Sequence, residues 1–87
     1  QYALAHYNLG VAQAGLGEYA SAQRELSVAL DLAPSYARAR FALGTVLLRQ
    51  GQRSAARDAF DRVAHDPNGD PALANLALAL RDSIHAP

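Results

Sequence analysis

An internal repeat is the feature that most constrains the fold of this chain. The pair Leu9-Gly10 recurs 34 positions later as Leu43-Gly44. Further pairs with the same spacing are Tyr2 and Tyr36, Tyr7 and Phe41, Gly17 and Gly51, Ala22 and Ala56, and Leu26 and Phe60. A fixed period of roughly 20 to 50 residues is typical of stacked helical hairpins, because one hairpin is too small to bury its own apolar face. The sequence therefore predicts a helical repeat protein.

Composition supports a helical fold and excludes one class of partner. Of the 87 residues, 51% are hydrophobic, and Ala and Leu outnumber the β-branched residues, which favours helices in one small domain. The 8 basic residues, all Arg, balance 8 acidic ones, so we expect no basic surface that would bind nucleic acid. The absence of Lys agrees either with a GC-rich genome or with selection of Arg for planar, bidentate contacts.

Several residue types and patterns are missing from the chain. It has no Cys and no apolar run of the ~20 residues that span a bilayer, so we expect no disulfide and no membrane insertion. Neither absence indicates a cellular compartment. Because the chain contains no Met, Gln1 is not a native initiation residue, and we expect the sequence to be part of a longer protein.

Punctuating residues predict five helices, over 2–14, 19–32, 36–50, 54–65 and 71–84. Gly17 and Gly51 follow the first and third, where glycine adopts a left-handed backbone at no steric cost. Pro34 and Pro67 follow the second and fourth and prevent their continuation. Asp70 before Pro71 is a typical helix start, since the carboxylate accepts a free backbone amide and proline suits the first helical position. The short connections predict antiparallel neighbours.

Small residues inside the helices indicate close packing. Gly10 and Gly44 each cost about 1 kcal/mol relative to alanine, so we expect a partner helix to approach them closely, with Ala22 and Ala56 as the facing positions. Apolar stripes at helical spacing extend this contact. They comprise Leu26, Ala29 and Leu30 in the second helix, Phe60, Val63 and Ala64 in the fourth, and Leu73, Leu76, Leu80 and Ile84 in the fifth, which we expect to pack on the fourth.

The ordered set of residues resembles the tetratricopeptide repeat (TPR). The first copy matches with Leu9, Gly10, Gly17, Tyr19, Ala22, Leu26, Ala29 and Pro34. The second copy matches with Leu43, Gly44, Gly51, Ala56, Phe60 and Pro67. The chain departs from the motif where His6 and Arg40 replace a large aromatic residue, where Arg53 replaces the tyrosine seen at Tyr19, and where Val63 replaces alanine.

The resemblance implies an all-α, right-handed solenoid of antiparallel helix hairpins. We expect one TPR-like domain over 1–87, with repeats over 3–36 and 37–69 and a fifth helix over 70–85. The second repeat is one residue shorter than the first. The fifth helix fits as a cap or as the start of a third unit, because Asn75-Leu76-Ala77 parallels Asn8-Leu9-Gly10.

In this family the first helix of each unit lines a concave groove that binds proteins. Carried onto this chain, the groove residues are Leu4, Tyr7, Asn8 and Val11, then Arg38, Phe41, Ala42, Thr45, Leu48 and Arg49, then Asn75 and Leu78. Such a surface suits a peptide or partner helix with apolar side chains and one or two carboxylates. The carboxylate clamp that recognises chaperone C-termini is missing, since its places hold Tyr7, Val11, Ala42, Pro71 and Asn75.

Two other interpretations remain open. The groove-facing apolar residues could pack against a neighbouring repeat, and the arginines could be solvated charges. The fifth helix has little polar surface, so the chain could be a structural element that completes a larger solenoid or a homodimer through the surface of helix 71–84. Alternatively, the repeats could be a docking appendage on an enzyme whose catalytic domain lies elsewhere.

No residue pattern predicts catalysis or a cofactor. His6, His65 and His85 do not combine with other ligands at metal-binding spacing, and we expect His6, in the place of a core aromatic, to serve packing. The serines lack a plausible base, and no glycine-rich loop is placed to hold phosphate groups. Asn68-Gly69-Asp70 reads as a turn, because the spaced acidic ligands of a calcium loop are missing. We therefore expect a non-enzymatic protein without metal or cofactor.

Overall fold

The computed structural model describes residues 2–84 and contains five α-helices within them. They are α1 (Tyr2–Gly15), α2 (Tyr19–Leu32), α3 (Ala37–Arg49), α4 (Arg53–Ala64) and α5 (Pro71–Ser83). Each helix begins and ends within one residue of the predicted position. Gln1 and His85 lie outside the described residues.

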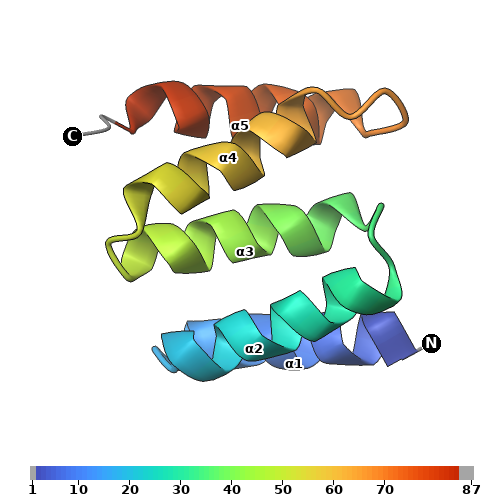
Figure 1. Cartoon of the computed structure of the whole chain (residues 1–87), viewed down its shortest axis with the longest axis vertical. Helices are drawn as coiled ribbons and strands as arrows, with labels where there is room; N and C mark the ends of the chain where they lie inside the picture. The colour runs from blue at the N-terminus through green and yellow to red at the C-terminus, as the bar shows by residue number, and fades with distance from the viewer. Residues whose placement is uncertain (1, 85–87) are drawn as a thin grey trace.

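The helices lie side by side and antiparallel in chain order (Figure 1). The hairpin of α1 and α2 lies at one end, α4 and α5 lie at the other, and α3 lies between them. The termini are at opposite ends of this stack, which measures 30 × 29 × 18 Å. Each helix packs on its neighbours in sequence, and α1 also contacts α3. The predicted all-α repeat fold is confirmed.

The predicted turn chemistry is also confirmed. Gly17 and Gly51 have φ of +80° and +78°, in the left-handed region that favours glycine. Asp70 accepts a hydrogen bond from the backbone N–H of Ala72 at 2.9 Å, and Pro71 is the first helical residue of α5. These positions mark three of the four chain reversals, those before α2, α4 and α5.

Glycine permits close packing inside each hairpin. A Cβ atom on Gly10 would lie 2.8 Å from Leu26 Cγ, and one on Gly44 would lie 2.8 Å from Phe60 Cε1. The predicted close approach is therefore confirmed, but the side chains that fill the space are bulky ones rather than Ala22 and Ala56. These two alanines are fully buried beside Leu26 and Phe60.

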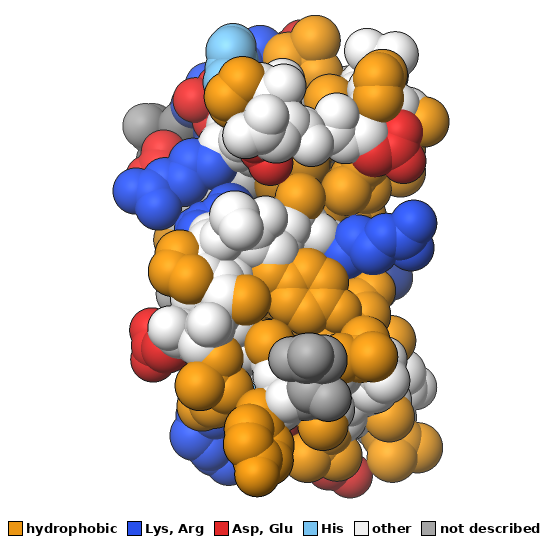
Figure 2. All heavy atoms as spheres, turned by 90° about the vertical axis from the view of Figure 1, so that its right-hand side faces the viewer, with side chains coloured by type: hydrophobic (Ala, Val, Ile, Leu, Met, Phe, Trp, Pro, Cys, Tyr) orange, Lys and Arg blue, Asp and Glu red, His pale blue; other side chains and the backbone are white. Residues whose placement is uncertain are grey.

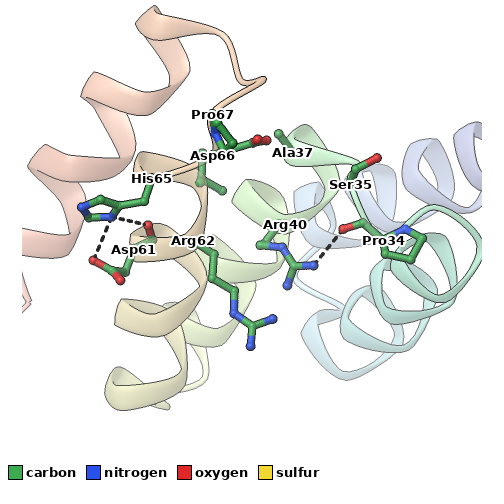
Figure 3. Close-up of a pocket in the computed structure, with 10 residues that line it drawn as sticks. Pro34, Ser35, Ala37, Arg40, Asp61, Arg62, His65, Asp66 and Pro67 are labelled. Carbon is green, nitrogen blue, oxygen red and sulfur yellow. Dashed lines mark hydrogen bonds and ion pairs between the residues drawn. The ribbon is translucent and has the colours of Figure 1, made fainter.

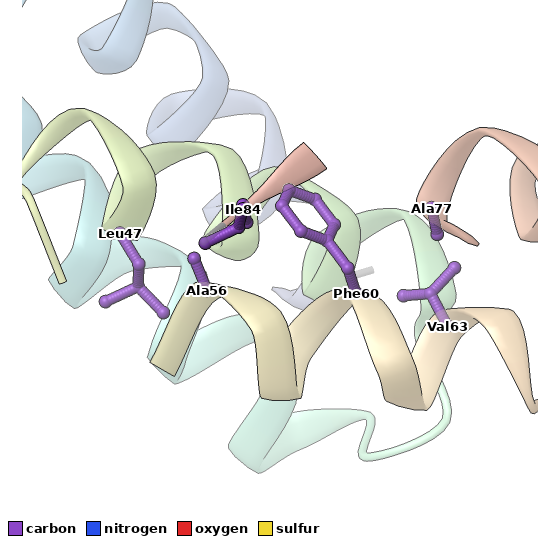
Figure 4. Close-up of a cluster of buried hydrophobic side chains, with 6 residues drawn as sticks. All are labelled: Leu47, Ala56, Phe60, Val63, Ala77 and Ile84. Atoms are coloured by element: carbon purple, nitrogen blue, oxygen red, sulfur yellow. The ribbon is translucent and has the colours of Figure 1, made fainter. Parts of the chain in front are cut away.

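Hydrophobic side chains form three connected clusters between the helices. The largest joins α3, α4, α5 and the residue after α5 (Figure 4), and its buried members are Leu47, Ala56, Phe60, Val63, Ala77 and Ile84. The other two lie between α2 and α3 and also receive Tyr7 from α1. Leu43 packs against all three clusters, so it links the two hairpins.

The packing of α5 corrects one expectation. Leu76, expected to face α4, is 51% exposed, and Ala77 is fully buried in its place. The packed residues are Leu73, Ala77, Leu80 and Ile84. At about 100° per residue these four share one side of the helix, and Leu76 lies at its edge. A small residue at position 77 also lets α5 approach α4 closely.

This stripe repeats the packing of α3 without a change of period. The helix α3 packs on α2 through Ala39, Leu43 and Val46. The corresponding residues of α5, each 34 positions later, are Leu73, Ala77 and Leu80, which pack on α4. In the packing, Ala77 therefore takes the place of Leu43, and the expected equivalence of Leu76 with Leu9 is wrong. The repeat boundaries themselves stay a prediction.

Candidate functional site

The predicted groove residues of α1 remain accessible, with one exception. Leu4 and Val11 are 47% and 43% exposed, and Asn8 is exposed as well. Tyr7 is half-buried, and its ring centroid lies 5.1 Å from that of Tyr36, the residue before α3. Burial, and after it the neighbouring Tyr7, raise the pKa of Tyr36. Tyr7 thus places this side of α1 against the start of α3.

The predicted residues of α3 divide in the same way. Arg38, Thr45 and Arg49 are exposed, and the Thr45 hydroxyl donates to the Phe41 carbonyl oxygen at 3.2 Å. Phe41 is half-buried, with its ring 5.5 Å from that of Phe60, and Leu48 packs against the same cluster. Phe41 and Leu48 therefore hold helices together as well as facing outward.

Asn75 and Leu78 are both exposed on α5, which packs on α4. Leu78 is 37% exposed and lies 34 positions after Gly44. In the second hairpin that position faces the following helix, through Phe60. Leu78 is thus placed where a further helix would pack.

Hydrophobic side chains gather on the side of the molecule where α1, α3 and α5 begin and α2 and α4 end. Figure 2 shows this side, with arginine side chains at both edges of the apolar area. The exposed hydrophobic residues include Tyr2, at 82%, as well as Leu4. The surface combines exposed apolar area with guanidinium groups.

Ion pairs fasten neighbouring helices to one another. His6 Nδ1 lies 2.7 Å from Glu25 Oε1 and joins α1 to α2. Arg81 donates to Asp61 at 2.6 Å and joins α5 to α4. This hydrogen bond from Arg81 is the main cause that lowers the pKa of Asp61. The sequence predicts a packing role for His6 and gives no sign of its carboxylate partner on α2.

A pocket of about 400 Å³ opens between α3, α4 and the two loops beside them (Figure 3). Arg40 from α3 and Arg62 from α4 extend into it, and Arg40 donates to the Pro34 carbonyl oxygen at 3.0 Å. Sequence reasoning did not find this pocket. The signal lies in the two copies of the repeat, because Glu25 and Val28 of the first copy correspond to Ala59 and Arg62 of the second.

Neither a metal-binding group nor a membrane-spanning helix occurs among residues 2–84. No three His, Asp or Glu side chains of this range form a group that could hold a metal ion. None of the helices in the same range combines the length and the apolar character that a membrane crossing requires.

The antiparallel hairpins, the recurring glycine contacts and the repeated packing register define a helical repeat protein. The family model of the tetratricopeptide repeat matches residues 13–80, and the chain belongs to that family. No curated protein and no solved structure matches the chain. Tetratricopeptide repeats generally mediate protein–protein interactions, and the family is typically non-enzymatic.

Proposed function

We propose that this chain is a protein-interaction module that binds a peptide or partner helix along the side of α1 and α3 formed by the predicted groove residues. The observation that carries this proposal is the exposure of apolar Leu4 and Val11 on α1, which contacts α3. A partner that covers exposed apolar side chains removes them from water, which lowers the free energy of the complex.

The residue types suggest the chemistry of the partner. Leu4 and Val11 supply apolar area, Asn8 supplies an amide, and Arg38 and Arg49 supply guanidinium groups for carboxylates. A partner with apolar side chains and one or two acidic residues satisfies both requirements. Asn75 would extend the surface onto α5, whereas Leu78 occupies the position of Gly44 and would face a further helix instead. This role requires neither a cofactor nor catalysis.

Substitutions by glutamate, on the proposed surface and on α2, test the proposal. Peptides selected from a random displayed library on the wild-type chain would be measured by fluorescence polarisation against Val11→Glu and Arg49→Glu. The controls are Val28→Glu, on a residue of α2 with 38% exposure, and Arg24→Glu, an exposed position on the same helix. We expect at least tenfold weaker binding by the first pair only. Weaker binding by the control pair alone would contradict the proposed surface.

A second candidate is an assembly role, and one observation favours it. Leu9 and Leu16 on α1 are 47% and 76% exposed, and they lie on one stripe with Ala5 and Ala12. In the second copy of the repeat this stripe corresponds to positions 39, 43, 46 and 50, and α3 uses that side to pack on α2. We infer that α1 would accept a helix similar to α2, from another repeat or a second copy of the chain.

A further inference from the structure

The pocket between α3 and α4 contains two guanidinium groups that lack an acidic partner. Among the ion pairs between residues 2–84, none includes Arg40 or Arg62. Arg40 is partly buried and Arg62 is exposed. Partial burial, and after it the charge of Arg62, lower the pKa of Arg40, so its guanidinium is neither fully hydrated nor neutralised. Two unpaired cations beside one cavity favour an anionic ligand.

The first repeat shows what the second has lost. In the first, His6 is paired with Glu25. At the corresponding positions of the second repeat, Arg40 replaces His6, and Ala59 replaces Glu25. The second repeat thus keeps a basic side chain in α3, makes it permanently charged and removes the carboxylate that would neutralise it.

A further change on α4 acts in the same direction. Val28 of the first repeat corresponds to Arg62 of the second, and positions 59 and 62 lie on the same side of the helix. Both differences from the first repeat therefore increase the positive charge at one place. Both arginines line the pocket, Arg40 from α3 and Arg62 from the neighbouring α4 (Figure 3).

The acidic residues that line the pocket already have other partners. Asp61 accepts from Arg81 at 2.6 Å and lies 3.4 Å from His65 Nδ1. Asp66 accepts from the backbone N–H of Asn68 at 3.0 Å. Neither carboxylate is within ion-pair distance of Arg40 or Arg62. An incoming anion therefore finds the donors of both arginines available, apart from the one that Arg40 gives to Pro34.

We propose that Arg40 and Arg62 form a binding site for a phosphate monoester, such as a phosphorylated side chain of a partner. Two guanidinium groups balance the roughly −1.5 to −2 charges of a phosphate monoester at pH 7 better than the single charge of a carboxylate. Planar guanidinium groups also match phosphate oxygens in bidentate hydrogen bonds. None of the proposed groove residues lines this pocket, so the site is separate from the α1–α3 surface.

Titration of the whole chain with inorganic phosphate tests the site. The side-chain Nε–H resonances of Arg40 and Arg62 would be followed by NMR, with sodium chloride used to hold the ionic strength constant. We expect saturating shifts at these two arginines and none at Arg24 or Arg53, which lie outside the pocket. A response that does not saturate, or that affects all arginines equally, would mean an adventitious ion only. Equal saturation by acetate would contradict the preference for phosphate.

Substitutions that restore the residues of the first repeat provide the variants. Arg62→Val should weaken phosphate binding at least tenfold, and because Arg62 is exposed this variant keeps the fold. Ala59→Glu should place a carboxylate opposite Arg40 and abolish binding. Arg24→Val, on exposed α2 surface, is the matched control and should bind as the wild type does. Undiminished binding by Arg62→Val would overturn the proposal, whether or not Ala59→Glu folds.

Discussion

Gly44 illustrates at the scale of the residue how a missing side chain permits the packing of a hairpin. Phe60 is fully buried, and its ring occupies the space that a Cβ atom on Gly44 would need. Glycine inside a helix costs about 1 kcal/mol relative to alanine, whereas burial of a phenylalanine side chain contributes roughly 1.5–3 kcal/mol. The buried ring therefore outweighs the cost of glycine. The same relation joins Gly10 to Leu26 in the first repeat.

We predict that Gly44→Ala destabilises the chain although alanine has the better helix propensity. The new methyl group would lie 2.8 Å from Phe60 Cε1, so the fully buried ring or one of the two helices would have to shift. Overpacking costs typically about 1–3 kcal/mol, so we expect a net loss of about 1 kcal/mol measured by urea unfolding. Gly15→Ala is the control, since a Cβ there meets nothing within 4 Å. Unchanged stability of Gly44→Ala would contradict this description of the packing.

The ion pair of Asp61 with Arg81 predicts a dependence of stability on pH. The folded-state pKa of Asp61 is lowered below the ordinary 3.8, chiefly by the hydrogen bond from Arg81. The contribution of this ion pair to the free energy of unfolding is therefore complete above pH 3.8, and it is lost as the pH falls through the folded-state pKa of Asp61. Asp61→Asn should lower the urea midpoint at neutral pH, and the difference from wild type should vanish in acid.

Asp58→Asn is the control for this prediction, because Asp58 is exposed on the same helix and belongs to no ion pair between the described residues. Its urea midpoint should follow that of the wild type throughout the titration. If Asp61→Asn also followed the wild type at neutral pH, the ion pair would contribute nothing to the attachment of α5.

At the scale of the element, helix positions could be predicted from sequence far better than helix faces. Gly17, Gly51 and the Asp70-Pro71 pair mark helix ends through backbone angle and capping, which are local properties. The side of α5 that packs is not a local property. Leu76 and Ala77 are adjacent in the sequence and both are apolar. Only the packing against α4 decides that Ala77 is the buried one.

The candidate sites show the same division. Spacing alone places Leu4, Asn8 and Val11 on one side of α1, and all three are exposed in the structure. The pocket is lined by Arg40 of α3 and Arg62 of α4, two residues that are 22 positions apart in the sequence. Arg40 departs from the repeat motif and Arg62 is not among its matched positions, so their proximity becomes visible only when α3 and α4 are placed together.

The exposed stripe of α1 predicts association between copies of the chain or with other repeats. Leu9→Glu on the stripe of α1 and Leu76→Glu on α5 each replace an exposed apolar side chain by a charged one. The two leucines are 47% and 51% exposed, so both variants should remain helical. If the wild type self-associates in size-exclusion chromatography with light scattering, Leu9→Glu should shift it toward the monomer. A wild type that stays monomeric at high concentration would remove the homodimer and leave only docking of another repeat.

At the scale of the whole molecule, we expect the two hairpins to unfold as one unit, because they share contacts through α3. Leu43 packs against every one of the three hydrophobic clusters, which include residues of α2, α3, α4 and α5. In a repeat protein, stability is approximately the sum of repeat and interface terms. A residue common to several interfaces should therefore affect all of them when it is removed.

We predict that Leu43→Ala lowers the free energy of unfolding by about 2 kcal/mol or more. The effect should extend across the whole chain, because the cavity left by the missing side chain would adjoin all three clusters. Leu9→Ala changes the same residue type one repeat earlier, where the side chain is 47% exposed, and should cost within about 0.5 kcal/mol. Urea unfolding measures both variants. Hydrogen exchange should show reduced protection in α2 and α4 together for Leu43→Ala. Loss of protection in one hairpin alone would mean that the repeats unfold independently and that Leu43 does not couple them.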